Sequence, residues 1–197
     1  ADITLRTEKQ KTSFNGTELL GKRIAVIGMG HVARWLPMPP LICMDVIGYD
    51  PYLSVESAWQ LEVIKRAQTI ADAIKGADFV TVHVPKNEET TGLIGTEELK
   101  HFKHGAVLLN YSRLGIVDNA AAVKALLMAA EKVYTDFSEA QILNNPNIVI
   151  MPHIGGNGEA EVRCAQIAAH EIMTYLETGN IKNSVNLPDV AAPLCQS

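Results

Sequence analysis

Apolar residues along the chain gather in short unbroken runs, separated by longer stretches in which polar and apolar positions mix. The run Ile-Ala-Val-Ile at 24–27 contains β-branched residues and does not alternate with polar ones, which is typical of a strand buried on both faces. Runs of the same length recur along the chain. They predict strands over 24–27, 45–50, 79–84, 106–110, 132–137 and 148–151.

Helix signals lie between these runs. Thr69 is followed three residues later by Asp72, a capping-box spacing that predicts a short helix to about residue 75. Thr96 can cap a helix whose first turn is acidic, and Gly105 is placed to end it. Asp118 can cap a further helix over 119–127.

The longest predicted helix covers 158–178, and Gly179 ends it. Its apolar positions recur with helical spacing and form one stripe, made of Val162, Ala165, Ala169, Ile172, Met173 and Leu176. Strands that alternate with helices predict an α/β fold, a Rossmann-like doubly wound parallel sheet. We expect residues 1–15 to be a linker or the remnant of a preceding domain, 16–180 to form one cofactor-binding domain, and 181–197 to be a tail.

A glycine turn, Gly-Met-Gly-His-Val-Ala, follows the first predicted strand directly. Gly28 permits a tight turn, and Gly30 lets the backbone approach a pyrophosphate. The pyrophosphate would lie at the N-terminus of a helix that begins with His31 and Val32. Asp50 ends the second predicted strand twenty residues later, where a carboxylate can accept both hydroxyls of a ribose and repel a 2′-phosphate. Together these features predict a site for a dinucleotide, NAD rather than NADP.

Three prolines disagree with the long helix that normally follows such a turn. Pro37, Pro39 and Pro40 would each cost about 3 kcal/mol inside a helix, so we expect a short helix over 31–36 and then an irregular stretch. The same prolines leave open a degenerate domain that folds without binding cofactor.

Three further segments lie at the predicted carboxyl ends of strands, where open α/β sheets bind ligands. They are His-Val-Pro at 83–85, Asn-Tyr-Ser-Arg-Leu-Gly-Ile-Val-Asp at 110–118, and Pro-His-Ile-Gly-Gly at 152–156. Arg113 is suited to bind a carboxylate with two parallel hydrogen bonds. His153 is suited to exchange a hydroxyl proton near neutral pH.

In this order, behind the glycine turn and Tyr-Asp-Pro-Tyr, these motifs resemble the NAD-binding domain of the D-isomer-specific 2-hydroxyacid dehydrogenase family. The resemblance covers about residues 16–186. Gly-Asn-Ile-Lys-Asn-Ser-Val-Asn near the end is most similar to bacterial D-3-phosphoglycerate dehydrogenases. Another 2-hydroxyacid dehydrogenase, such as a glyoxylate or hydroxypyruvate reductase, and an NAD-sensing corepressor module remain alternatives.

The resemblance implies NAD as cofactor and Arg113, His153 and a glutamate as catalytic residues. Glu139 is our candidate for that glutamate, although the family's usual Glu-Pro pair is absent here. Asp136 would bind the nicotinamide carboxamide. The implied cofactor-binding set is Gly28, Gly30, His31, Val32, Asp50, His83, Val84, Pro85, Thr90, Ser112, Arg113, Asp136, His153, Gly155 and Gly156.

The remaining expectations come from composition and from the same resemblance. A net charge of −5 over 197 residues argues against nucleic acid or an anionic membrane as partner, and no apolar stretch is long enough to span a membrane. Three scattered cysteines predict neither a metal site nor disulfides, and indicate a reducing cytoplasm. The resemblance implies a homodimer acting on a small 2-hydroxy or 2-oxo acid. Because the family's substrate domain is largely absent, we expect weak NAD binding and little turnover from this chain alone.

Overall fold

The structure is a computed structural model that describes residues 17–30, 43–53, 64–126, 130–140, 142–154, 158–181 and 184. The chain divides into two compact units, residues 1–152 and 153–197. The predicted helix over 31–36 and the three prolines behind it lie outside the described residues.

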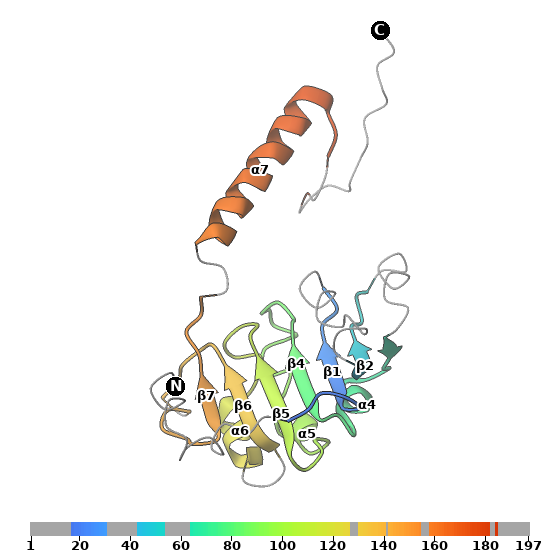
Figure 1. Cartoon of the computed structure of the whole chain (residues 1–197), viewed down its shortest axis with the longest axis vertical. Coiled ribbons are helices and arrows are strands. Elements are labelled where there is room, and N and C mark those ends of the chain that lie inside the picture. Colours follow the sequence, from blue (N-terminus) through green and yellow to red (C-terminus); the bar gives the residue numbers. More distant parts are fainter. Residues whose placement is uncertain are drawn as a thin grey trace. The chain divides into compact units, whose positions relative to one another are not determined.

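The first unit contains a seven-stranded sheet in which every strand pair is parallel (Figure 1). The spatial order is β3-β2-β1-β4-β5-β6-β7, so the chain reverses direction across the sheet between β1 and β4. Such a reversal opens a crevice at the carboxyl ends of the two strands. The strands are β1 (Arg23–Ile27), β2 (Asp45–Tyr49), β3 (Lys65–Arg66), β4 (Phe79–Val82), β5 (Ala106–Asn110), β6 (Ala130–Thr135) and β7 (Ile148–Ile150).

Three helices of the first unit are α4 (Ile70–Ile74), α5 (Thr96–Leu99) and α6 (Asn119–Leu126). α5 contacts both α4 and α6, while α4 packs on β1 and β2 and α6 packs on β6. The core lies on both faces of the sheet because successive strand residues point to opposite sides. Ala25 and Ile27 belong to the larger buried cluster, whereas Val26 packs with Met29 and Val46 in a second one. The predicted Rossmann-like α/β fold is confirmed.

Two predicted caps are found as expected. Thr69 Oγ1 accepts a hydrogen bond from the Asp72 amide at 3.1 Å, which fixes the start of α4. Asp118 Oδ1 accepts from the amides of Ala120 and Ala121 at 3.0 and 3.1 Å, which does the same for α6. These side chains satisfy amides that would otherwise lack an intrahelical partner.

The predicted cap at Thr96 is wrong. Gly95 is the N-cap of α5, and the Glu98 carboxylate accepts its amide at 3.0 Å, so the acidic first turn takes over the capping role. The helix also ends at Leu99 rather than near Gly105. The amides of Lys100 and His101 donate to carbonyls three residues back rather than four, so the chain continues past Leu99 in 3₁₀-type turns instead of an α-helix.

The second unit is built around α7 (Glu159–Thr178), which ends, as predicted, where Gly179 takes a left-handed conformation with φ 72°. None of its described side chains is buried. The apolar stripe predicted for this helix is therefore present but exposed, with Val162 at 59% and Leu176 at 75% of full exposure. The described part of the second unit does not bury this stripe by itself.

Candidate functional site

The first glycine of the turn touches the strand next to it. Gly28 follows β1, has φ +90°, and donates its amide to the Tyr49 carbonyl at 2.8 Å. A Cβ at this position would lie 2.8 Å from Val84 Cγ1 and 2.9 Å from the carbonyl carbon of His83. Both the backbone conformation and the close approach require glycine here.

The second glycine has open space where a side chain would be. A Cβ built on Gly30 meets no atom of the described residues within 4 Å, and Gly30 is exposed. This opening fits the pyrophosphate of a dinucleotide, which binds against backbone where no side chain intervenes. His31 and Val32, predicted to complete the turn, lie outside the described residues.

Asp50 is fixed by two backbone amides. Its Oδ2 accepts from Met29 in the glycine turn at 2.8 Å, and its Oδ1 accepts from Tyr52 at 2.8 Å. Each carboxylate oxygen has a second lone pair, so both can still accept from a ribose hydroxyl. The predicted ribose acid is therefore tied to the predicted phosphate turn.

A cleft of about 540 Å³ joins these residues, at the crevice between β1 and β4. Its volume lies in the range usual for small-molecule and cofactor sites. The structure brings together in its lining seven residues of the predicted cofactor set, namely Gly28, Gly30, Asp50, His83, Val84, Pro85 and Thr90. Among the described residues of the lining, seven others were not predicted: Ile27, Tyr49, Pro51, Tyr52, Asn87, Glu89 and Leu93.

His83 lines one side of this cleft. Its amide continues the ladder of the sheet by donating to the Ile27 carbonyl at 2.8 Å, and its ring Nε2 lies 2.8 Å from Thr81 Oγ1. Burial lowers the pKa of His83 below its ordinary value of 6.5, because a buried site disfavours the charged ring.

The wall formed by Pro85 and Thr90 is held by a local network. Thr90 Oγ1 donates to the Pro85 carbonyl at 2.6 Å, and the Thr90 amide donates to Asn87 Oδ1 at 2.8 Å. The Asn87 amide in turn donates to Thr90 Oγ1 at 2.9 Å. The loop is thus closed by reciprocal hydrogen bonds between the side chains and backbone amides of Asn87 and Thr90.

A second polar contact joins two loops at this cleft. The Tyr52 hydroxyl, just past β2, donates to Glu89 Oε2 at 2.5 Å. The neighbouring carboxylate raises the pKa of Tyr52 above its ordinary value of 10.0, because it stabilises the protonated phenol. Neither residue was predicted from the sequence to belong to the site. Tyr52 lies two positions after Asp50, and that proximity was the signal that could have found it.

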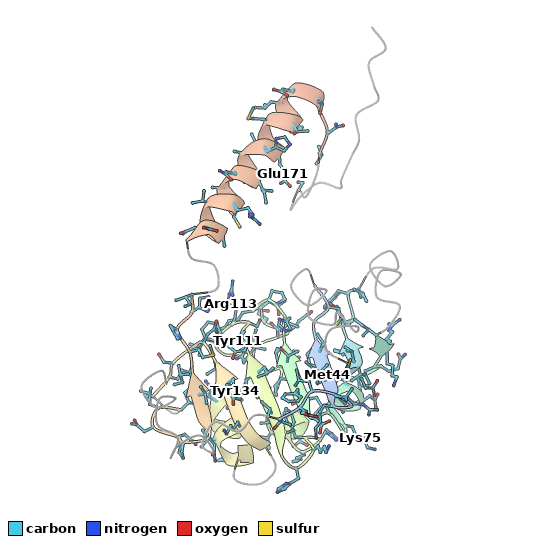
Figure 2. The ribbon with its side chains drawn as sticks, viewed as in Figure 1. Met44, Lys75, Tyr111, Arg113, Tyr134 and Glu171 are labelled. Carbon is cyan, nitrogen blue, oxygen red and sulfur yellow. The ribbon has the colours of Figure 1, made fainter. Side chains whose placement is uncertain are left out.

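Arg113 lies on the loop after β5. Figure 2 shows Arg113 and Tyr111 at the edge of the sheet where the strands end, with Lys75 at the opposite edge. Ser112, the residue before Arg113, donates its hydroxyl to the Val84 carbonyl and so ties this loop to the β4 loop. Arg113 is exposed, and its Nη1 donates to the Ser112 carbonyl at 2.8 Å, which leaves other guanidinium donors for a ligand.

The carboxylates after β6 also lie in this first unit. Glu139 Oε2 accepts from Asn119 Nδ2, at the start of α6, at 2.7 Å. Burial, together with the charge of Asp136, raises the pKa of Tyr111. The Asp136 carboxylate therefore influences the pKa of Tyr111, a residue of the same loop that carries Arg113.

His153 begins the second unit and is exposed. Gly155 and Gly156 lie outside the described residues. Among the residues that the structure describes, no group of three or more His, Cys, Asp or Glu side chains could hold a metal ion. No described helix is long and apolar enough to cross a membrane.

Comparison with known families gives one match over most of the chain. Residues 1–155 match the family described as D-isomer specific 2-hydroxyacid dehydrogenase, NAD binding domain. The chain is 34% identical over 201 residues to the D-3-phosphoglycerate dehydrogenase of Archaeoglobus fulgidus, covering 96% of this chain and 38% of that protein. It is 32% identical to the corresponding Mycobacterium bovis protein, covering 95% and 37%. The chain thus spans less than two fifths of these relatives.

Solved structures show the same fold. Apo D-mandelate dehydrogenase from Rhodotorula graminis superposes with a TM-score of 0.78 at 17% identity, covering 93% of this chain and 56% of that one. A glyoxylate reductase from Paecilomyes thermophila gives a TM-score of 0.75 at 23% identity, covering 87% and 54%. D-lactate dehydrogenase with NAD+ from Lactobacillus jensenii gives 0.71 at 23% identity, covering 89% and 58%.

Proposed function

Because the chain belongs to the D-isomer specific 2-hydroxyacid dehydrogenase family, as its NAD-binding domain, we propose that it serves an NAD-dependent D-3-phosphoglycerate dehydrogenase. The reaction is hydride transfer at C2 of a phosphorylated 2-hydroxy acid, a step of serine biosynthesis. The observation that carries the proposal is the cleft in which amide-held Asp50 and open Gly30 lie together. The similarity to D-3-phosphoglycerate dehydrogenases supports this choice of substrate.

The residues of the cleft divide the binding of the cofactor between them. Gly30 offers open backbone to the pyrophosphate, and Asp50 offers two fixed oxygens to the adenosine ribose. His83 and Thr90 form the wall beside them. When bound, NAD supplies the hydride acceptor, and the protein supplies binding and orientation.

The proposed chemistry of the substrate falls to three other side chains. Arg113 binds the substrate carboxylate, for which its exposed guanidinium provides two parallel donors. We assign His153 to take the proton of the C2 hydroxyl and Glu139 to be the catalytic carboxylate. Asn119 donates to Glu139 and holds one of its oxygens in place. Asp136 binds the nicotinamide carboxamide.

Steady-state kinetics of the full-length natural protein with NADH test the proposal. We expect kcat/KM for 3-phosphohydroxypyruvate to exceed that for hydroxypyruvate or glyoxylate at least about tenfold, because a lost charged contact is worth roughly that much. A preference for glyoxylate would assign a different member of the family. Saturable NADH binding with no turnover of any 2-oxo acid would instead favour a sensing module.

Arg113→Lys tests the carboxylate site in the same assay. We expect KM for the 2-oxo acid to rise about tenfold or more, because lysine cannot form the bidentate contact. Arg66→Lys is the matched control, since Arg66 is an exposed residue of β3 and does not line the cleft. Equal effects of the two substitutions would refute the assignment of Arg113.

We also propose that the full-length protein is a cytoplasmic homodimer. The exposed apolar stripe of α7 and the free thiols of Cys43 and Cys164 support this proposal. Light scattering of the purified protein tests it, and a monomeric mass would refute the dimer.

A further inference from the structure

Tyr52 and Glu89 meet from two separate loops, one after β2 and one after β4. They lie 37 residues apart in sequence, yet the Tyr52 hydroxyl lies 2.5 Å from Glu89 Oε2. Both residues line the cleft. Their contact therefore joins the wall that carries Asp50 to the wall opposite it.

We propose that Glu89, held in place by Tyr52, is a second specificity-determining residue of this cleft and excludes a dinucleotide whose adenosine ribose carries a phosphate. This inference rests on the proposed function, because it takes the cleft to be the adenosine site. It assigns Tyr52 a positioning role, since it acts through Glu89.

The charged side chains described in the lining of the cleft are all acidic. Asp50 and Glu89 line it, whereas none of its described lining residues is a lysine or an arginine. A phosphate on the ribose would bring additional negative charge to two carboxylates, with no cation among the described lining residues to neutralise it. A ribose that carries two hydroxyls donates hydrogen bonds instead, and carboxylates accept these.

Tyr52 connects the two acidic residues of the cleft. The backbone amide of Tyr52 donates to Asp50 Oδ1 at 2.8 Å, and the side-chain hydroxyl of Tyr52 donates to Glu89 Oε2. One tyrosine therefore fixes the position of Glu89 with respect to Asp50. Because the phenol donates, the Glu89 oxygen that it touches acts as an acceptor, which the raised pKa of Tyr52 supports.

Glu89→Gln and Tyr52→Phe separate the two roles, and Glu88→Gln is the matched control. Glu88 is the preceding residue, is exposed and does not line the cleft. Its substitution by Gln therefore makes the same change in net charge, but outside the cleft. The readout is the dissociation constant of the full-length protein for NADH and for NADPH, from fluorescence titration at low ionic strength. The quantity compared is the ratio of the two constants.

We expect Glu89→Gln to reduce the preference for NADH over NADPH by about three- to fivefold, the size expected when one charge is removed from an exposed site. Tyr52→Phe should reduce it by a smaller factor, because the carboxylate remains but is no longer held. Glu88→Gln should leave the ratio within about twofold.

An unchanged ratio in Glu89→Gln, or an equal change in Glu88→Gln, would overturn the inference while leaving the proposed function intact. Failure of the unsubstituted protein to bind NADH saturably would overturn the proposed function and this inference with it.

Discussion

The two glycines of the turn make one prediction that separates folding from binding. Gly28 has φ +90°, and a Cβ there would lie 2.8–3.0 Å from atoms of His83 and Val84. A Cβ at Gly30 would meet no atom within 4 Å in the part of the chain that the structure describes. Alanine at the first position should therefore destabilise the fold, whereas alanine at the second should not.

The magnitude for Gly28→Ala follows from two contributions. A left-handed conformation costs a non-glycine residue about 1–2 kcal/mol, and crowding against packed neighbours costs about 1–3 kcal/mol. Part of the crowding is against the His83 backbone, which cannot rotate away as a side chain could. We expect a loss of about 3 kcal/mol in the free energy of unfolding, which lowers the melting temperature by about 6–12 °C for a domain of this size.

Urea denaturation followed by circular dichroism measures the effect of each substitution on the free energy of unfolding, and NADH titration measures its effect on cofactor affinity. Gly30→Ala should unfold within about 0.5 kcal/mol of the unsubstituted chain, as substitutions away from packed or strained sites usually do. It should nevertheless weaken NADH at least about tenfold, because its methyl group occupies the space assigned to the pyrophosphate. Equal losses of stability in the two variants would refute the structural reasoning for Gly28.

Three further predictions concern stability. Ser112→Ala should lower the free energy of unfolding by about 1–2 kcal/mol in urea titrations, because the Val84 carbonyl loses its hydroxyl donor; no change would contradict this. His83 has a lowered pKa, so the stability that its neutral form contributes is complete above 6.5 and falls as the pH decreases through its folded-state pKa. In denaturation series across pH 7 to 5, His83→Gln should flatten that decline, and an unaltered slope would contradict the prediction. Hydrogen bonds from Lys65 and Lys103 lead the causes that hold the pKa values of Asp45 and Asp78 below 3.8, so this stability is complete well above pH 3.8 and is lost as the pH falls through the lowered values. In the double variant Asp45→Asn and Asp78→Asn, the free energy of unfolding should fall less steeply with decreasing pH than in the unsubstituted chain. An equally steep fall would contradict the prediction.

The central strands could be predicted because each one is an apolar run on its own. β1 has buried residues on both faces, and every residue of β5 is buried or partly buried, so their sequences contain few polar positions and their ends are sharp. β3 could not be predicted in this way. It consists of Lys65 and Arg66, both exposed, and only its pairing with β2 makes it a strand.

The start of α5 shows a different limit. The rules of helix capping recognised Thr96 as a cap, but the Glu98 side chain satisfies the Gly95 amide and moves the start by one residue. Both arrangements obey the same local chemistry, and the choice between them depends on the path of the preceding loop. For the same reason, the sequence indicated Gly28 and Asp50 but gave no sign of the contact between Tyr52 and Glu89, which joins two loops.

The order of the strands also has a consequence for the kinetics of folding. Ile24 pairs with Phe79, 55 residues later, whereas Tyr134 pairs with Val149 only 15 residues later. Closing the longer loop costs about 1 kcal/mol more in chain entropy. The sheet therefore consists of two sequence-local halves, β1 to β3 and β4 to β7, and the junction of β1 with β4 is the contact expected to form last. The cleft lies at that junction, so refolding chains should acquire NADH binding only after most of their secondary structure.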